Sequence, residues 1–294
     1  MTVLLAAALT LPCIFAGGGA AARTNLETAG VTRICTDADL GSREKLASPG
    51  TAPRPGLASP TRSPWIVANG WRFLRNPQGK FLYEVPAGKA ALAAAEAIAY
   101  GADAALKIDA ADAGSVGTLV KFAAALPAAD LPPVADVAVV DDGSAATGEV
   151  MNLLARRNLL FQVVQAPSPQ FRVNIAIGSP EYPREAAGDP SAFALRIRRQ
   201  LGDDQRALRI FGSEVVIARL TAGGGRARLH LINYGGREIE GLRVRLRGSY
   251  AGGEARVPGA GTVMLQDFAA AGGFTEFSVP RIATYAVIDL RASP

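Results

Sequence analysis

The chain has 294 residues, of which 49% are hydrophobic and 19% are charged, and this composition is typical of a folded protein rather than a disordered one. The length is sufficient for two ordinary domains. The net charge is +5, but 26 of the 31 basic residues are Arg, which is the bias expected from a GC-rich genome, and no basic run is interleaved with aromatic residues. We therefore expect no nucleic-acid partner.

The first predicted element is an apolar run over residues 3–16, followed by small residues and a first charge at Arg23. Such a run is too short for a stable membrane span and is typical of a secretory signal, so we expect a signal peptide over residues 1–22 and a secreted or periplasmic location. No basic residue precedes the run, which leaves a misassigned start or a buried apolar segment as the alternatives. Cleavage would remove Cys13 and leave Cys35 alone, which excludes a disulfide framework.

A proline-rich segment follows. Residues 23–64 show no sustained periodicity, and prolines spaced by small and polar residues crowd the second half of the segment. This composition predicts a disordered linker, because few residues in it can bury surface.

Strands and helices alternate from residue 65 to residue 205, where we expect one α/β domain. The pattern predicts strands at 65–74, 80–85, 104–109, 135–140, 160–164 and 171–178, and helices at 87–100, 115–126, 147–158 and 192–201. This alternation predicts parallel strands joined by crossover helices. The expected arrangement is an incomplete barrel-like or flavodoxin-like α/β unit.

The hydrophobic pattern changes after residue 205. Glycine-rich turns separate predicted strands at 208–220, 226–233, 241–248, 261–267, 274–279 and 284–290, and no helical pattern interrupts them. Short strands at this spacing predict an antiparallel β-sandwich over residues 206–294. The predicted fold class is therefore α/β followed by all-β.

Three aspartates at strand ends are the candidate catalytic residues. Asp109 ends one predicted strand, and Asp141 and Asp142 end another, at the edge of a parallel sheet where ligands usually bind. The alternative is that they cap the turns and helices that follow. A pair of carboxylates from Glu84 and Glu96 could also hydrolyse a glycosidic bond, although Glu96 has the position of an ordinary helix former on a solvated face.

Aromatic residues are concentrated near the start of the α/β domain. Trp65, Trp71 and Tyr83 are the candidate substrate-binding residues, because sugars stack on flat aromatic faces; ordinary core packing is the alternative. The only histidine, His230, shares a predicted sheet face with Arg228, which predicts an exposed side chain without a catalytic role. The chain has no Walker loop, GxGxxG, GxSxG, HExxH or paired CxxC motif, so we expect no cofactor and no metal.

Three segments resemble the C-terminal portion of multidomain glycoside hydrolases of the β-galactosidase type. They are VADVAVVDDGSAATGEVMNLLARRNLLFQVV (134–164), ARLHLINYGGREIEGLRVRLRG (227–248) and FSVPRIATYAVIDL (277–290). In such enzymes an amidotransferase-like α/β domain and a small β domain follow a catalytic barrel. The stretch from PWIVANGWRFL to AALKID (64–109) is similar to the last strand–helix units of that barrel.

The resemblance implies an exported, carbohydrate-associated protein related to accessory domains of these enzymes. A complete barrel needs about 250 residues, and the early barrel strands that carry the acid pair have no counterpart here, so the resemblance leaves open whether catalysis is retained. One alternative is an active glycoside hydrolase that uses the strand-end aspartates. Another is a structural or assembly module. The substrate and the oligomeric state stay open.

Overall fold

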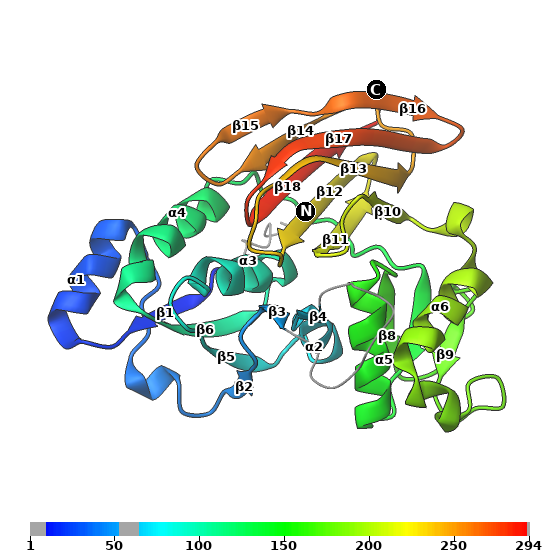
Figure 1. The fold of residues 1–294 in the computed structure, drawn as a ribbon, viewed down its shortest axis with the longest axis horizontal. Helices are drawn as coiled ribbons and strands as arrows, with labels where there is room; N and C mark the ends of the chain where they lie inside the picture. Colours follow the sequence, from blue (N-terminus) through cyan, green and yellow to red (C-terminus); the bar gives the residue numbers. More distant parts are fainter. Residues whose placement is uncertain (1–9, 53–64, 293–294) are drawn as a thin grey trace, which may run out of the picture.

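The computed structural model describes residues 10–52 and 65–292. Two α/β units, each built on a sheet of parallel strands, lie side by side, and a β-sandwich lies across them (Figure 1). Our expectations for residues 1–9 and 53–64 fall outside the described residues.

The first unit is built on a four-stranded parallel sheet of order β1-β6-β5-β2. Its strands are β1 (Cys13–Ala16), β2 (Glu44–Leu46), β5 (Lys80–Glu84) and β6 (Asp103–Ile108), and its helices are α1 (Gly19–Ala29), α2 (Gly70–Arg75), α3 (Ala90–Tyr100) and α4 (Ala113–Ala124). A separate antiparallel pair joins β3 (Gly50–Ala52) to β4 (Trp65–Val67). Helix α3 is an alanine-rich run of good helix formers that ends at Gly101, whose φ of 63° suits the left-handed C-terminal position.

The N-terminal apolar run belongs to this sheet, whereas we expected a signal peptide over residues 1–22, of which the structure describes residues 10–22. Strand β1 pairs with β6, and Cys13 and Ile14 are buried. A disulfide joins Cys13 to Cys35, with Cα atoms 5.4 Å apart, which also corrects the excluded disulfide. The two interpretations share one sequence pattern, because a parallel strand that is buried on both faces is as uninterruptedly apolar as a secretory signal.

Residues 23–52 are folded as well, which corrects the expected linker over this part of the chain. They form α1, the 3₁₀ turn η1 (Asp37–Asp39), β2 and β3. Because β2 and β3 have only three residues each, no periodic pattern marks them. The first α/β unit therefore begins well before residue 65. Within the piece predicted as extended over 65–74, only β4 is a strand, and α2 begins at Gly70.

The second unit has its own parallel sheet of order β8-β7-β9 and its own core. It contains β7 (Val137–Val140), β8 (Phe161–Val164), β9 (Asn174–Ala176), α5 (Ala145–Arg156), the turn η3 (Arg184–Gly188), α6 (Pro190–Leu201) and the turn η4 (Asp203–Gln205). The sequence predicted the strands and the two α-helices of this unit but not its 3₁₀ turns, and placed them in one domain with the preceding strands. Hydrophobic periodicity identifies a buried strand and says nothing about which strand it pairs with.

The C-terminal unit is the predicted antiparallel sandwich. One sheet has the order β10-β13-β17-β16 and the other β11-β12-β18-β14-β15. The strands are β10 (Leu208–Phe211), β11 (Val216–Gly223), β12 (Arg226–Asn233), β13 (Ile239–Arg247), β14 (Gly252–Val257), β15 (Gly261–Met264), β16 (Gln266–Ala271), β17 (Phe274–Ile282) and β18 (Tyr285–Arg291). An α/β part followed by an antiparallel β part is therefore present. The single strand predicted at 208–220 is divided at Gly212, whose φ is 78°.

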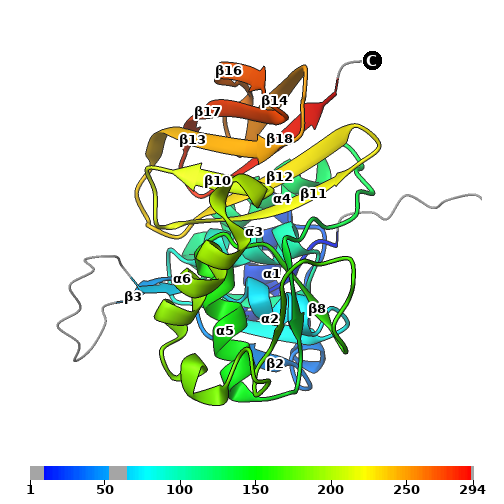
Figure 2. The same cartoon turned by 90° about the vertical axis from the view of Figure 1, so that its right-hand side faces the viewer.

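The sandwich packs on the first α/β unit through the outer face of its five-stranded sheet (Figure 2). Ile217, Ile232 and Val287 belong to the same buried cluster as side chains of α3 and α4. On the same face, His230 is 5% exposed and Arg228 is 2% exposed. The sheet face that we predicted to be solvated is therefore an interface, because a second layer covers it.

Candidate functional site

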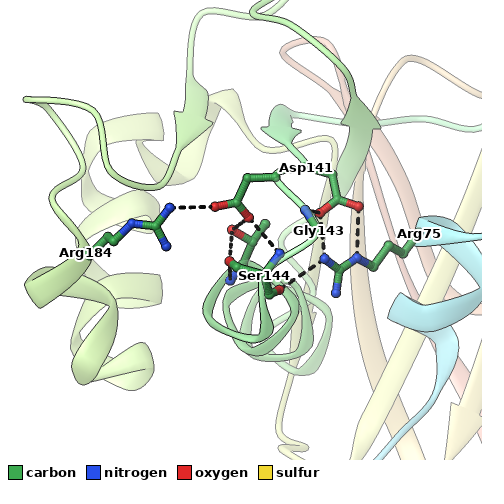
Figure 3. A network of polar contacts seen from close by, with 7 residues as sticks. Arg75, Asp141, Gly143, Ser144 and Arg184 are labelled. Carbon is green, nitrogen blue, oxygen red and sulfur yellow. Dashed lines mark hydrogen bonds and ion pairs between the residues drawn. The ribbon is translucent and has the colours of Figure 1, made fainter.

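The turn after β7 holds Asp141 and Asp142 at the carboxyl end of the strand, as predicted. Asp141 accepts two hydrogen bonds from Arg75 of α2, from Nε at 2.9 Å and from Nη2 at 2.7 Å. Asp141 also accepts the backbone N–H of Gly143. Figure 3 shows Arg75 and Arg184 approaching this turn from opposite sides. The bidentate pair therefore connects the first α/β unit to the second.

Asp142 is held by its own turn and helix. It accepts the backbone N–H of Ser144 at 3.0 Å and the hydroxyl of Thr147 at 2.7 Å, and Arg184 lies 3.1 Å away. The residue that caps α5 is Ser144, whose hydroxyl accepts the N–H of Thr147.

Both strand-end carboxyls are stabilised in the ionised form. The hydrogen bond from Arg75 lowers the pKa of Asp141, and hydrogen bonds, first of all from Ser144, lower the pKa of Asp142. A general acid must carry a proton at the working pH. The turn is therefore built to keep these groups charged and positioned, which does not suit that role.

Asp109 lies at the end of β6, in the other parallel sheet. It accepts the backbone N–H of Ala111 at 2.9 Å and so caps the 3₁₀ turn η2 (Ala110–Asp112). Among the described residues, no hydrogen bond or ion pair connects Asp109 with the turn of Asp141 and Asp142. The structure therefore distributes the three candidate aspartates over two sheets.

The three candidate aromatic residues do not form a common exposed face. Tyr83 is fully buried, and Trp71 is 8% exposed within the core of the second unit. Trp65 is half-buried, and the guanidinium of Arg156 lies 3.7 Å from its ring centroid. Trp71 and Tyr83 therefore pack in the hydrophobic cores, which is the alternative to a sugar-stacking role.

Glu96 is a buried polar centre that we predicted to lie on a solvated helix face. It is 0% exposed, and its carboxylate accepts hydrogen bonds from the hydroxyls of Tyr83 at 2.5 Å and Tyr234 at 2.6 Å. The backbone and side-chain amides of Asn69 donate to it at 2.6 and 3.2 Å. Burial raises the pKa of Glu96, and the two tyrosine hydrogen bonds oppose that rise. The signal was present in the sequence, since a helix that is apolar all round is a buried helix.

A cavity of about 550 Å³ lies where the C-terminal end of α5, helix α6 and strand β10 meet. Its lining includes Phe211 and Ser213, and it combines an aromatic ring with hydrogen-bonding groups. Sequence analysis missed this cavity, because its walls come from three separate elements.

Five arginines contribute to the walls of the cavity: Arg156, Arg157, Arg198, Arg206 and Arg209. Among the described residues that line it, the single carboxylate is that of Glu214. A second carboxylate, Asp203 of η4, contacts three of the arginines. The cavity is therefore predominantly positive.

The described parts of the chain contain no group of three or more His, Cys, Asp or Glu side chains placed to hold a metal ion. Among the same residues, every helix falls short of the length and apolar character that crossing a membrane requires.

No family model and no curated protein sequence matches the chain. Among solved structures, the fold is similar to that of alpha-L-fucosidase isoenzyme 2 from Paenibacillus thiaminolyticus, with a TM-score of 0.58 and 11% identity over 76% of this chain and 62% of that one. A beta-galactosidase from Bacillus circulans sp. alkalophilus aligns with 92% of this chain and 58% of its own, at 10% identity and a TM-score of 0.43. A catalytic mutant of Gan42B, a GH42 beta-galactosidase from G. stearothermophilus, gives 10% identity, 92% and 57% coverage and a TM-score of 0.41.

The protein therefore shares a fold with a glycoside hydrolase. The chain spans 62% of the length of that fucosidase and 58% of the first beta-galactosidase. At this identity the similarity concerns the fold alone.

Proposed function

We propose that this is a carbohydrate-binding protein related to accessory regions of glycoside hydrolases, and that the cavity between α5, α6 and β10 is its saccharide site. The observation that carries the proposal is this cavity of about 550 Å³, within a fold similar to that of the fucosidase. Small-molecule sites usually occupy roughly 300 to 1,000 Å³, which accommodates a short saccharide.

The chemistry of the walls supports this assignment. A saccharide offers hydroxyl groups around its rim and C–H groups on its ring faces. Arginine guanidinium groups supply several donors in a planar arrangement. Phe211, with Arg209 4.9 Å from its ring centroid, supplies an apolar surface for the ring face of a sugar.

The proposal is one of binding and assigns no catalytic residue. Hydrolysis of a glycosidic bond needs one carboxyl that is protonated and a second that is ionised. The lowered pKa values of Asp141 and Asp142 favour ionisation of both. Their hydrogen bonds to Arg75, Ser144 and Thr147 are those of a structural turn.

A secreted or periplasmic location is part of the proposal. The Cys13–Cys35 disulfide supports it, because disulfides persist mainly in oxidising compartments. Alkylation of thiols in protein purified from its native host, followed by mass spectrometry, tests it. We expect no alkylated cysteine before reduction and two afterwards; free thiols before reduction would contradict the proposed location.

A glycan-array screen of the full chain, followed by calorimetric titration of each binding saccharide, tests the saccharide site. Ser213→Trp places a large ring in the cavity, and we expect it to weaken binding at least about tenfold, the effect of losing about 1.4 kcal/mol. Ser249→Trp makes the same change on an exposed turn of the sandwich and is the matched control. Equal affinity of the two variants would show that the saccharide binds elsewhere, and failure of every saccharide to bind would overturn the proposed function.

A further inference from the structure

The arginines of the cavity outnumber the carboxylates that could neutralise them. Asp203 accepts a bidentate pair from Arg198 at 2.9 and 2.7 Å, and it lies 3.4 Å from both Arg206 and Arg209. One carboxylate therefore forms ion pairs with three guanidinium groups. Arg157 contributes a further charge and donates to a neutral partner, the hydroxyl of Ser191, at 2.8 Å.

Arg206 is the most buried of the five arginines that line the cavity. It is 6% exposed and donates to the backbone carbonyls of Arg157 at 3.3 Å and Asn158 at 3.1 Å. Its Nε is buried without a hydrogen-bond partner. Burial, and then the charge of Arg198, lower the pKa of Arg206. A buried charge is costly unless it is paired and hydrogen-bonded, so this wall favours an anion in addition to Asp203.

We propose that this arginine-lined cavity binds an anionic group, a carboxylate or a phosphate. The identification of its carrier as an acidic saccharide rests on the proposed function. Guanidinium groups bind planar carboxylates and phosphates through paired N–H···O bonds, and charge-assisted bonds of this kind are roughly twice as strong as neutral ones. The cavity supplies such groups, because arginines from the C-terminal end of α5, from α6, from β10 and from the residues just before β10 all line it.

The test compares three probes by calorimetric titration of the full chain: digalacturonate, its uncharged counterpart galactobiose, and pyrophosphate. We expect digalacturonate to bind about tenfold more tightly than galactobiose, the effect of one charge-assisted hydrogen bond. We also expect its affinity to fall as NaCl is raised, because salt screens exposed charges.

Two variants test whether the anion binds in the cavity. Arg157 is exposed and Arg209 is half-buried, so Arg157→Gln and Arg209→Gln remove charge while leaving the core intact. Each substitution is expected to weaken the binding of digalacturonate about tenfold. Arg23→Gln is the control, because Arg23 is an exposed residue of α1 that pairs with Glu27 and does not line the cavity. Undiminished binding by both cavity variants would overturn the placement.

The outcomes separate the two proposals. If galactobiose binds as tightly as digalacturonate, the anion inference fails and the saccharide function stands. If pyrophosphate binds and neither saccharide does, the anion site stands and the assignment of its carrier as an acidic saccharide fails. If none of the three probes binds, the anion inference is overturned.

Discussion

The hydroxyl of Tyr234 donates a 2.6 Å hydrogen bond to the carboxylate of Glu96, a residue 138 positions earlier in the chain. Tyr234 directly follows β12 of the sandwich, and Glu96 lies within α3 of the first α/β unit. Both side chains are fully buried. This hydrogen bond therefore joins the two units through a buried polar pair at their interface.

Removal of that donor is expected to destabilise the protein. Tyr234→Phe keeps the ring and leaves the buried carboxylate of Glu96 with three donors in place of four, at a cost of about 1 to 3 kcal/mol. Urea unfolding at neutral pH measures the loss. Tyr250→Phe, at a half-buried tyrosine within the sandwich, is the control and is expected to change stability little. Equal effects of the two substitutions would show that the bond to Glu96 contributes nothing specific.

Asp136 predicts a distinctive pH dependence. Burial raises its pKa from 3.8 to about 6, its Oδ1 accepts the N–H of Ala207 at 2.9 Å, and its Oδ2 is buried without a partner. The folded state binds the proton of Asp136 more tightly than the unfolded chain does. The contribution of this proton to the free energy of unfolding is therefore fully present below the unfolded pKa and is lost as the pH rises to about 6. A rise of about two pKa units corresponds to about 3 kcal/mol.

Asp136→Asn removes this titration. We expect the variant to be more stable than the natural chain at pH 7, by up to about 3 kcal/mol, and to gain nothing near pH 4. Urea unfolding across this pH range measures the difference. Asp204→Asn is the control, since the side chain of Asp204 is 85% exposed. A constant difference between variant and natural chain at all pH values would contradict the raised pKa of Asp136.

The Arg75–Asp141 ion pair is expected to contribute more to stability than the neighbouring Arg184–Asp142 pair. Its side chains are 21% and 14% exposed, whereas Arg184, which pairs with Asp142, is 60% exposed. Asp141→Asn should cost about 1 to 3 kcal/mol, and Arg184→Gln at most about 1 kcal/mol. Thermal unfolding of both variants makes the comparison.

The Asp141 effect should also depend on pH with the opposite sign to that of Asp136. The pKa of Asp141 is lowered in the folded state, so its contribution is present above the unfolded pKa and is lost as the pH falls through the folded pKa. Asp141→Asn should therefore differ from the natural chain most at neutral pH and least in acid. A larger loss for Arg184→Gln than for Asp141→Asn would contradict this account of the turn.

Two glycines of α4 form a matched pair. A Cβ on Gly117 would lie 2.2 Å from the carbonyl oxygen of Ala29 at the end of α1, whereas a Cβ on Gly114 would meet nothing within 4 Å. Gly114→Ala is expected to be neutral or to stabilise by up to about 1 kcal/mol through helix propensity. Gly117→Ala is expected to destabilise by about 1 to 3 kcal/mol, because the helices must separate. Thermal unfolding that ranks the two variants in the reverse order would contradict the close approach of α1 and α4.

Local pattern was enough to predict many of the regular elements. The alanine-rich run of α3, with Gly101 behind it, carries its own start and stop signals, whereas α6 begins at Pro190, before the predicted residue 192. The glycine turns and alternating residues after residue 205 likewise predicted the sandwich. These features depend on neighbouring residues along the chain, so the amino-acid order alone specifies them.

Tertiary structure decided which of these elements meet. It placed the apolar run of β1 inside a sheet, divided one predicted α/β domain into two sheets, and covered the His230 face with helices. It also surrounded Glu96 with donors and brought the arginines of α5, α6 and β10 around one cavity. The physical reason is that burial and charge neighbourhood depend on segments distant in sequence. The same glutamate suits a solvated helix face until the packing of a second unit supplies its partners.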